Sequence, residues 1–259
     1  MSSINMTFDF YLSNRKHYLS CFLPVVVAAV SLMTSIPALA MTASQPTVGF
    51  DIAWDNDYIT EGRNNLEKGG IIWGVASVEQ DDLVAFAVVG RADQVHYIEW
   101  NVGVEYTLHL HDEVDATIGY QRLEFYGDER ESDNEFFSSL TYTGFSWVVP
   151  AINYTFATEA AGYFVALSLH SPWEINNQLT LTPYIVQGFD FQYSSEQHNG
   201  ANHFQFGLEA EHQFNDSMAV SAHISHSIAQ EDIKQQARAE DIQGSLDQTY
   251  AGLHFKLIF

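Results

Sequence analysis

The sequence is poor in cysteine and in basic residues, and both shortages restrict what the protein can do. Cys21 is its only cysteine. It lies in a segment that we expect to be removed, so the rest of the chain has neither a disulfide nor thiol chemistry. Only 10 Lys and Arg residues stand against 33 Asp and Glu residues, which gives a formal net charge of −23. Binding of DNA or RNA depends on basic side chains clustered at phosphates, so this balance argues against a nucleic-acid partner.

The N-terminal region lacks a hydrophobic run long enough to span a membrane. The apolar run Cys21–Met33 is shorter than the ~20 residues that cross a bilayer as a helix. A basic pair precedes it and a small-x-small tripeptide ending at Ala40 follows it, as in a secretory signal peptide. We therefore predict that residues 1–40 are removed on export. Residues 41–259 contain no Gly/Pro/Ser-rich linker and are expected to form one domain.

Cofactor motifs are absent as well. We find no glycine-rich phosphate loop and no zinc-ligand spacing, and we expect no cofactor. His109 and His111 lie two residues apart beside Asp112, and on a strand they share a face that could hold a metal. Because no further ligands converge on them in the sequence, we expect solvated residues at a strand end. We predict no metal site and no catalytic residue.

What the chain does contain is a recurring alternation of apolar and polar residues. In residues 203–214, mostly apolar side chains occupy the even positions from Phe204 to Phe214, and Gln, Gly and Glu occupy the odd positions from Gln205 to Gln213. This period of two is typical of β-strands. The pattern predicts about twelve strands, at residues 47–59, 70–78, 83–91, 96–109, 114–126, 135–143, 148–158, 162–170, 178–193, 203–214, 217–229 and 247–259.

Alternating strands fit two architectures. A soluble β-sandwich buries its apolar faces, whereas an outer-membrane barrel turns them to lipid. Four features favour the barrel: the export signal, strands of ten or more residues, tight turns that alternate with long polar connections, and an even strand count. In hydrocarbon every backbone N–H and C=O must be paired, so the sheet has to close. We predict an all-β, antiparallel, up-and-down transmembrane β-barrel surrounded by lipid in a Gram-negative outer membrane.

The C-terminal strand is consistent with closure. Phe255, Leu257 and Phe259 share one face and run to the last residue, with no polar tail behind them. We expect this face to meet lipid and its backbone to pair with the first strand. C-terminal aromatic strands of this kind resemble the assembly signal of outer-membrane proteins, which implies that the barrel-assembly machinery recognises this strand.

The polar faces of the predicted strands are acidic. A barrel of twelve strands should leave a narrow pore, and rings of carboxylates in a pore favour cations. We predict a porin-like channel for passive diffusion of small polar solutes that prefers cations. An acidic proteome or a salty habitat explains the charge equally well. The residues predicted to line the pore are Asp51, Asp55, Asp57, Glu99, Glu105, Asp115, Asp190, Glu209, Glu211, His223, Ser225 and Lys256.

Residues 55–70 resemble a known family. They read DNDYITEGRNNLEKGG, and Asp57, Tyr58 and Gly62 match the first strand of the TorF family of outer-membrane porins, where Asp-Tyr is followed by two residues and Arg-Gly. Here the arginine follows the glycine, as Arg63, which departs from the family order. The resemblance implies a porin-like role. An external turn also explains the Gly and Asn residues of this stretch.

Two other functions stay open. Some outer-membrane barrels are lipid hydrolases that resemble one another in a His-x-Ser pair at the lipid-facing rim, and His223 and Ser225 have this spacing. Ala222 and Ile224 are apolar and should face the lipid. His223 and Ser225 alternate with them, so we predict that they face the lumen, away from a lipid substrate. The other alternative is a structural or adhesive barrel whose external loops bind partners.

One segment breaks the alternation. Tyr120, Leu123 and Phe125 cannot share one face of a regular strand, so we predict a β-bulge near Gln121 and Arg122. Other aromatic residues fall near strand ends or on outward positions, where barrels carry aromatic girdles. These residues are Tyr97, Trp100, Trp147, Trp173 and Tyr193.

Overall fold

Twelve long strands form the framework of the structure. The computed structural model describes residues 45–66, 68–127, 130–195 and 199–259, so the predicted signal peptide lies outside the described residues. Smaller elements are the β2 (Ile59–Thr60) and β3 (Arg63–Asn64) hairpin, β11 (Trp173–Asn176) and helix α2 (Glu231–Ala239). The twelve long strands are β1 (Thr47–Asp55), β4 (Ile71–Gln80), β5 (Leu83–Ala92), β6 (Ile98–His111), β7 (Val114–Tyr126), β8 (Arg130–Tyr142), β9 (Val149–Ala157), β10 (Gly162–His170), β12 (Leu179–Phe191), β13 (Asn199–Asn215), β14 (Met218–Ala229) and β15 (Gln248–Ile258).

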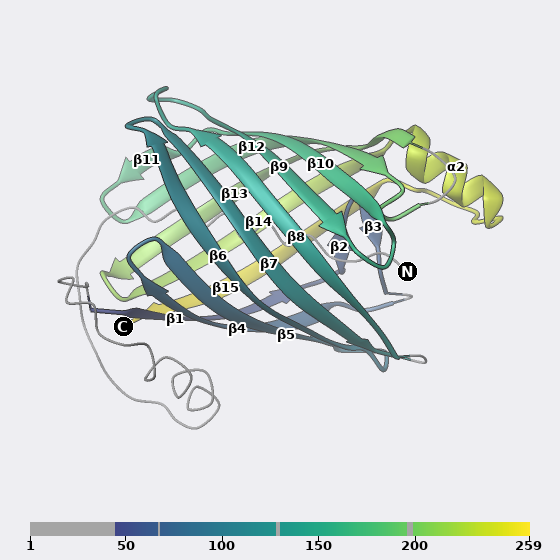
Figure 1. The fold of residues 1–259 in the computed structure, drawn as a ribbon, viewed down its shortest axis with the longest axis horizontal. Helices are drawn as coiled ribbons and strands as arrows, with labels where there is room; N and C mark the ends of the chain where they lie inside the picture. Colours follow the sequence, from purple (N-terminus) through teal and green to yellow (C-terminus); the bar gives the residue numbers. More distant parts are fainter. Residues whose placement is uncertain (1–44, 67, 128–129, 196–198) are drawn as a thin grey trace.

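These strands close into an antiparallel barrel (Figure 1). Strands that follow one another along the chain pair side by side, β10 pairs with β12, and β1 pairs with both β4 and β15. The seam runs to the last residue. There, the Phe259 backbone N donates to the Val48 carbonyl O at 2.8 Å, and the Val48 N donates back at 2.9 Å. The predicted pairing of the first and last strands is confirmed.

Apolar side chains cover the outside of the barrel. Ile52 is 62% exposed, Ile224 is 56% exposed and Leu253 is 56% exposed, while the polar residues beside them in each strand point inward. A water-soluble protein does not expose a continuous apolar surface of this extent, but a lipid-facing barrel does. The arrangement excludes the β-sandwich. Further members of the outward apolar set are Trp54, Val102, Val104, Leu108, Ile118, Phe206, Leu208 and Phe214.

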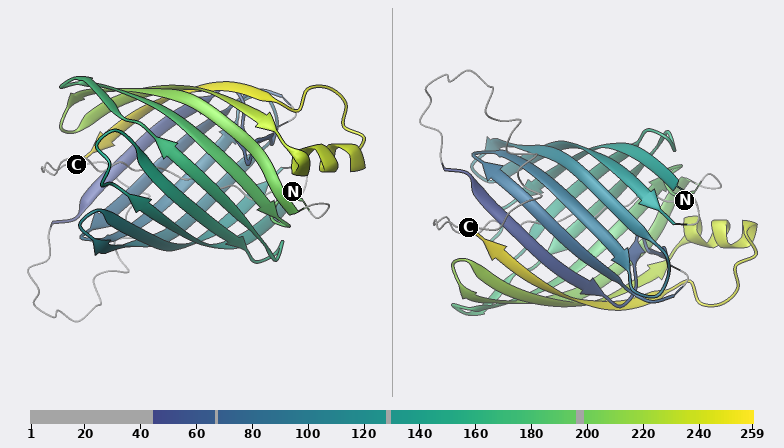
Figure 2. Two further views of the ribbon diagram at one scale, coloured as in Figure 1. Left: turned by 90° about the horizontal axis from the view of Figure 1, so that it is seen from above. Right: turned by 90° about the horizontal axis from the view of Figure 1, so that it is seen from below.

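The two ends of the barrel differ (Figures 1 and 2). At one end, tight turns join β4 to β5, β6 to β7 and β13 to β14, and here β1 begins and β15 ends. We call this the turn end. The opposite end, called the loop end, carries the β2–β3 hairpin and α2, which projects beyond the strands. Within the described residues, no helix is long and apolar enough to cross a membrane.

Most strand positions agree with the alternation in the sequence. The main differences lie at the loop end, where β1 stops at Asp55, β8 and β13 begin earlier than predicted, and α2 replaces part of a predicted loop. The predicted bulge is wrong, because β7 pairs with β6 and β8 without a shift at Gln121 and Arg122. Leu123 and Phe125 instead keep the inward parity of β7, and Leu123 is fully buried. Leu123 and Phe125 are apolar because the lumen beside them is filled by other protein side chains, and Phe125 packs against an apolar cluster.

Candidate functional site

The lumen at the loop end is filled by a segment that folds back into the barrel. We call residues 56–66 the inward loop; its β2–β3 hairpin lies near the loop end (Figure 1). Tyr58 is only 2% exposed, and its ring meets the Trp73 ring edge-on, with the centroids 5.2 Å apart. Leu66 joins the same apolar cluster, which extends over the inner faces of β4 and β5 and includes Phe125. One side of this end of the barrel therefore has a packed hydrophobic core.

A buried hydrogen bond anchors the inward loop to the barrel wall. Tyr58 Oη donates to Glu99 Oε2 at 2.8 Å, and Tyr97 Oη donates to the same oxygen at 2.9 Å. Asn101 Nδ2 donates to the other oxygen, Oε1, at 2.7 Å. Burial, together with the Glu99 carboxyl group, raises the pKa of Tyr58 well above its usual range, so Tyr58 keeps its proton and acts as the donor. Three donors thus satisfy a fully buried carboxyl group.

The tip of the inward loop reaches the opposite wall. Gly62 has a φ of +76°, a conformation that favours glycine. A Cβ at this position would lie 2.6 Å from the Cβ of His203 on β13 and 3.0 Å from the Ser227 Oγ on β14. The loop therefore crosses the lumen and leaves no room for a side chain at its tip.

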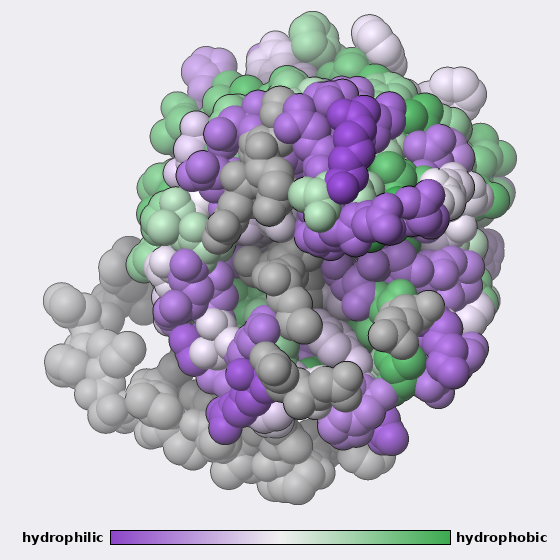
Figure 3. Space-filling view, turned by 90° about the vertical axis from the view of Figure 1, so that its right-hand side faces the viewer, coloured by the Kyte–Doolittle hydropathy of each residue, from purple (hydrophilic) through white to green (hydrophobic). Residues whose placement is uncertain are grey.

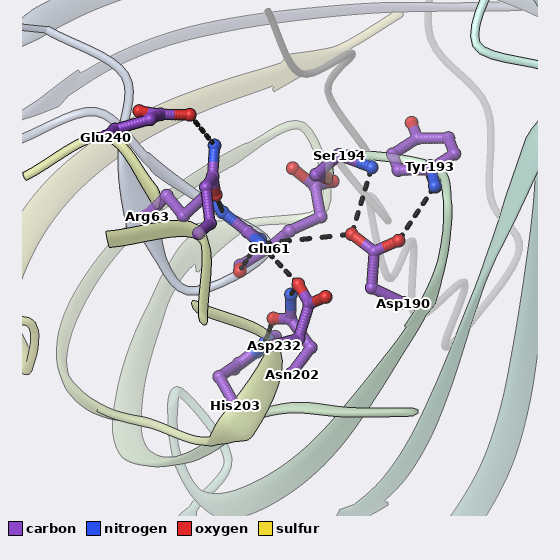
Figure 4. A network of polar contacts seen from close by, with 10 residues as sticks. Glu61, Arg63, Asp190, Tyr193, Ser194, Asn202, His203, Asp232 and Glu240 are labelled. Carbon is purple, nitrogen blue, oxygen red and sulfur yellow. Dashed lines mark hydrogen bonds and ion pairs between the residues drawn. The ribbon is translucent and has the colours of Figure 1, made fainter. Parts of the chain in front are cut away.

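Arg63 fastens the inward loop to α2 and the neighbouring strands (Figure 4). Its Nη2 donates to Asp232 Oδ2 at 2.5 Å and its Nε donates to Gln236 Oε1 at 2.7 Å. Asn202 Nδ2 donates to the same Asp232 oxygen at 3.0 Å, and Asp190 Oδ2 lies 4.0 Å from Arg63 Nη2. Asp232 and Asp190 are fully buried. We call these five residues the latch: Arg63 contacts two carboxylates and the Gln236 amide, and Asn202 supports Asp232.

A second polar layer supports the latch from the side of β12. Asp190 Oδ1 accepts a hydrogen bond from the Tyr193 backbone N at 2.7 Å, and Oδ2 accepts one from the Ser194 N at 2.9 Å. Tyr193 Oη donates to Glu135 Oε1 at 2.5 Å. Viewed onto the loop end, hydrophilic residues gather around the mouth and over α2, and hydrophobic residues lie on the outer circumference (Figure 3). At the loop end, a layer of hydrogen-bonded polar residues therefore covers the apolar cluster.

Below the inward loop the lumen opens into a cavity of about 360 Å³. Asp57 and Tyr58 of the inward loop border it, as do residues from β1, β13, β14 and β15. The carboxylates around it outnumber its one lysine. The charged and histidine residues that line it are Asp51, Asp55, Asp57, Glu209, Glu211, Lys256, His170, His223 and His254.

The predicted pore-lining residues therefore fall into three groups. Asp51, Asp55, Asp57, Glu209, Glu211, His223 and Lys256 line the cavity. Glu99, Asp190 and Ser225 also point inward but are buried by their neighbours. Glu105 and Asp115 occupy inward positions outside the cavity lining, and Asp115 Oδ1 lies 2.6 Å from His109 Nδ1 near the turn end.

Two of the predicted girdle residues are placed differently. Trp100, Trp147 and Trp173 are 49%, 67% and 58% exposed, as expected for outward positions. Tyr97 and Tyr193 instead point inward and donate to Glu99 and Glu135. For these two residues the prediction is wrong. Proximity to a strand end does not distinguish a residue on the outer surface from one that supports an inward-folded loop.

The residues of the two histidine motifs of the sequence have separate partners in the structure. Ser225 Oγ pairs with Tyr184 Oη at 2.5 Å, whereas His223 Nε2 lies 3.4 Å from Asp55 Oδ1. Both side chains face the lumen, where a membrane lipid does not reach them. The β6–β7 pairing shifts between His109 and His111, and His109 pairs with Asp115 and Asp82.

Comparisons with known proteins place the fold among outer-membrane porins. The KdgM porin superposes with a TM-score of 0.57 at 8% identity, covering 81% of this chain and 98% of that one. The same porin in complex with disordered oligogalacturonate gives 0.53 at 6% identity, covering 82% and 98%. The NanC porin gives 0.52 at 10% identity, covering 80% and 98%. No family model matches the sequence, and no curated protein matches it. The closed twelve-stranded barrel is thus the fold of outer-membrane porins.

The latch could not be found from the sequence, although its central residue stood out. Arg63 is one of only 10 Lys and Arg residues in the sequence. Its partners Asp232 and Gln236 are 169 and 173 residues away in the chain, within a segment that reads as a polar loop. A rare arginine directly after a glycine was the only signal available in the sequence. The sequence interpretation of an external turn is wrong, because this turn lies against the inner wall.

Proposed function

We propose that this protein is an outer-membrane channel for small polar solutes, that it prefers cations, and that the inward loop narrows its lumen. The observation that carries the proposal is the acidic cavity of about 360 Å³ inside a closed barrel whose exterior is apolar. A barrel with a polar interior and a lipid-facing exterior offers water-soluble molecules a route through hydrocarbon. The loop end, with its longer polar connections, would face the outside of the cell.

The charge of the lumen supports the preference for cations. Five carboxylates line the cavity beside Lys256 and three histidines, and carboxylates in a confined pore attract cations and repel anions. One structural neighbour is a porin in complex with oligogalacturonate, which is a polycarboxylate. We infer that this chain uses the same barrel size for solutes of the opposite charge or of no charge.

Electrical recording tests the proposal. The protein, refolded in detergent and inserted into a planar bilayer under a potassium chloride gradient, should give stepwise currents. Its reversal potential should have the sign expected for cation flow. A properly folded barrel that gives no current steps contradicts the channel. Current steps with an anion-selective reversal potential contradict only the assignment of charge preference.

The structure gives less support to the two alternatives. A hydrolase would need Ser225 and His223 to meet at a surface open to lipid, and they lie inside the lumen with different partners. An adhesive role would rest on external loops, and at that end α2 is tied to the inward loop through Asp232 and Gln236. We therefore propose the channel alone.

A further inference from the structure

We propose that Asp55, His223 and His254 bind a divalent transition-metal ion inside the lumen, with zinc as the reference ion. Each residue offers one ligand atom, and these atoms lie within 4.8 Å of one another. Imidazole nitrogens with one carboxylate oxygen are a common ligand set for zinc, and three protein ligands leave a fourth position for water or solute. The site goes beyond the proposed channel function and does not depend on it.

The strand register brings the ligands together. Asp55 of β1 lies opposite Gly252 of β15, and Gly252 lies opposite His223 of β14. A side chain at Gly252 could not be accommodated, because its Cβ would lie 1.9 Å from Asp55 Oδ1 and 2.6 Å from His223 Cε1. The missing side chain lets the carboxylate and the imidazole meet across β15. His254 is two residues along β15 on the same face, with its ring centroid 5.7 Å from that of His223.

Two of the ligand atoms are buried without a hydrogen-bond partner. Asp55 Oδ1 and His223 Nε2 face each other at 3.4 Å, and neither has a hydrogen-bond partner among the described residues. Buried polar atoms in native proteins are nearly always satisfied, so an unsatisfied pair needs an explanation, and a bound ion is one. Metal–ligand bonds of ~2.0–2.2 Å are reached by small side-chain movements from this starting arrangement.

The surroundings favour a cation. Asp51 Oδ1 lies 3.6 Å from His254 Nδ1, so His254 can bind the ion through Nε2 while its Nδ1 faces a carboxylate. This carboxylate–histidine–metal arrangement fixes the ring and strengthens the ligand. Glu209 on β13 lies opposite His223 in the strand register. The only lysine along the cavity, Lys256, is two residues beyond His254 and opposite Asp51.

Metal titration of the tag-free protein, refolded in detergent at neutral pH, tests the site. We expect one zinc ion per chain by calorimetry, and a visible spectrum of tetrahedral cobalt when Co²⁺ replaces it. Asp55→Asn, His223→Gln and His254→Gln should each lower zinc affinity by at least about tenfold. The matched control is His170→Gln, because His170 lines the same cavity but stacks on Tyr184 and lies outside the ligand group; its affinity should be unchanged.

A second measurement uses only the native chain, in case a variant does not fold. Zinc should protect His223 and His254, but not His170, from modification by diethyl pyrocarbonate, as read by mass spectrometry. Folding of every variant is checked by its heat-modifiable migration in gels. The proposal is overturned if the folded native protein binds neither zinc nor cobalt, or if zinc affinity persists in a folded His223→Gln/His254→Gln variant. Because neither readout involves current, a failure here is distinguishable from a failure of the channel proposal.

Discussion

The two halves of the lumen are built from the same twelve strands but differ in what the strands enclose. In the loop half, the inward loop packs Tyr58 and Leu66 into an apolar cluster and holds Arg63 against buried carboxylates. In the turn half, a cavity of about 360 Å³ is bordered by acidic residues and histidines. The barrel therefore combines a region packed like a soluble core with a wet, charged region. Residues 56–66 create this difference by packing on apolar side chains of β4 and β5 and by contacting α2.

Removing the latch should cause the largest change in stability and in conductance. Arg63→Ala leaves Asp232 buried without its arginine, and breaking such a buried pair costs about 3–5 kcal/mol. We expect urea unfolding in detergent to shift to lower concentration and single-channel conductance to rise, because the inward loop is released. The control is Arg130→Ala, whose ion pair with Glu124 is exposed and should contribute little to stability. Unchanged conductance in a folded Arg63→Ala barrel would contradict the narrowing role.

A smaller loss is expected at the tip of the inward loop. In Gly62→Ala, the new Cβ meets the Cβ of His203 and the backbone stays at positive φ, a strain of about 1–3 kcal/mol. Unfolding measurements should show this loss together with a moderate rise in conductance. Gly74→Ala is the matched control, because nothing lies within 4 Å of a Cβ built there. Equal stability of the two variants would mean that the tip does not contact the wall.

The anchor of the inward loop should contribute less again. Tyr58→Phe removes the hydroxyl group that donates to Glu99 but keeps the ring packed on Trp73. We expect the free energy of unfolding to fall by about 1–2 kcal/mol. Thermal unfolding compares it with Tyr106→Phe, which changes a lipid-facing ring that is 42% exposed and should cost almost nothing. If both variants unfold at the same temperature, the bond to Glu99 does not hold the inward loop.

The turn half is expected to affect selectivity rather than stability. Glu209→Gln and Glu211→Gln each remove one carboxylate from the cavity lining, so each should shift the reversal potential modestly toward zero, and the double variant should shift it further. Glu124→Gln serves as the control because Glu124 pairs with Arg122 and Arg130 away from the cavity. If Glu124→Gln shifts the reversal potential by the same amount, selectivity depends on the overall charge of the molecule and not on the cavity.

The sequence predicted the barrel well because the physics of a barrel strand is local. Each strand must alternate between lipid and lumen, so residues such as Ile52 and Asp51 reveal their faces by parity alone. Closure then follows from the need to pair every backbone group in hydrocarbon. Even the apparent exception at Leu123 and Phe125 obeyed parity. The pattern at Leu123 and Phe125 predicts a bulge only if every residue that faces the lumen is assumed to be polar.

The interior of the loop half was not predictable in the same way. The latch joins Arg63 to Asp232 across 169 residues, and nothing local to either residue indicates the other. The inward positions of Tyr97 and Tyr193 likewise depend on residues of other segments, Tyr58 for Tyr97, and Glu135 and Phe164 for Tyr193. The cluster of Asp55, His223 and His254 spans three neighbouring strands, so its ligand spacing appears only when the register is known. Contacts between distant segments are where sequence patterns stop being informative.

Cysteine accessibility at two heights of one strand tests the central contrast most directly. Ala219 and Ser227 both face inward on β14, Ala219 in the cavity lining and Ser227 fully buried beneath Gly62. In a Cys21→Ser background reconstituted in lipid vesicles, Ala219→Cys should react quickly with a water-soluble thiol reagent, and Ser227→Cys slowly. Adding Arg63→Ala should accelerate only the reaction at position 227. Equal rates at both positions, or no response to Arg63→Ala, would contradict a lumen that is filled at one end and open at the other.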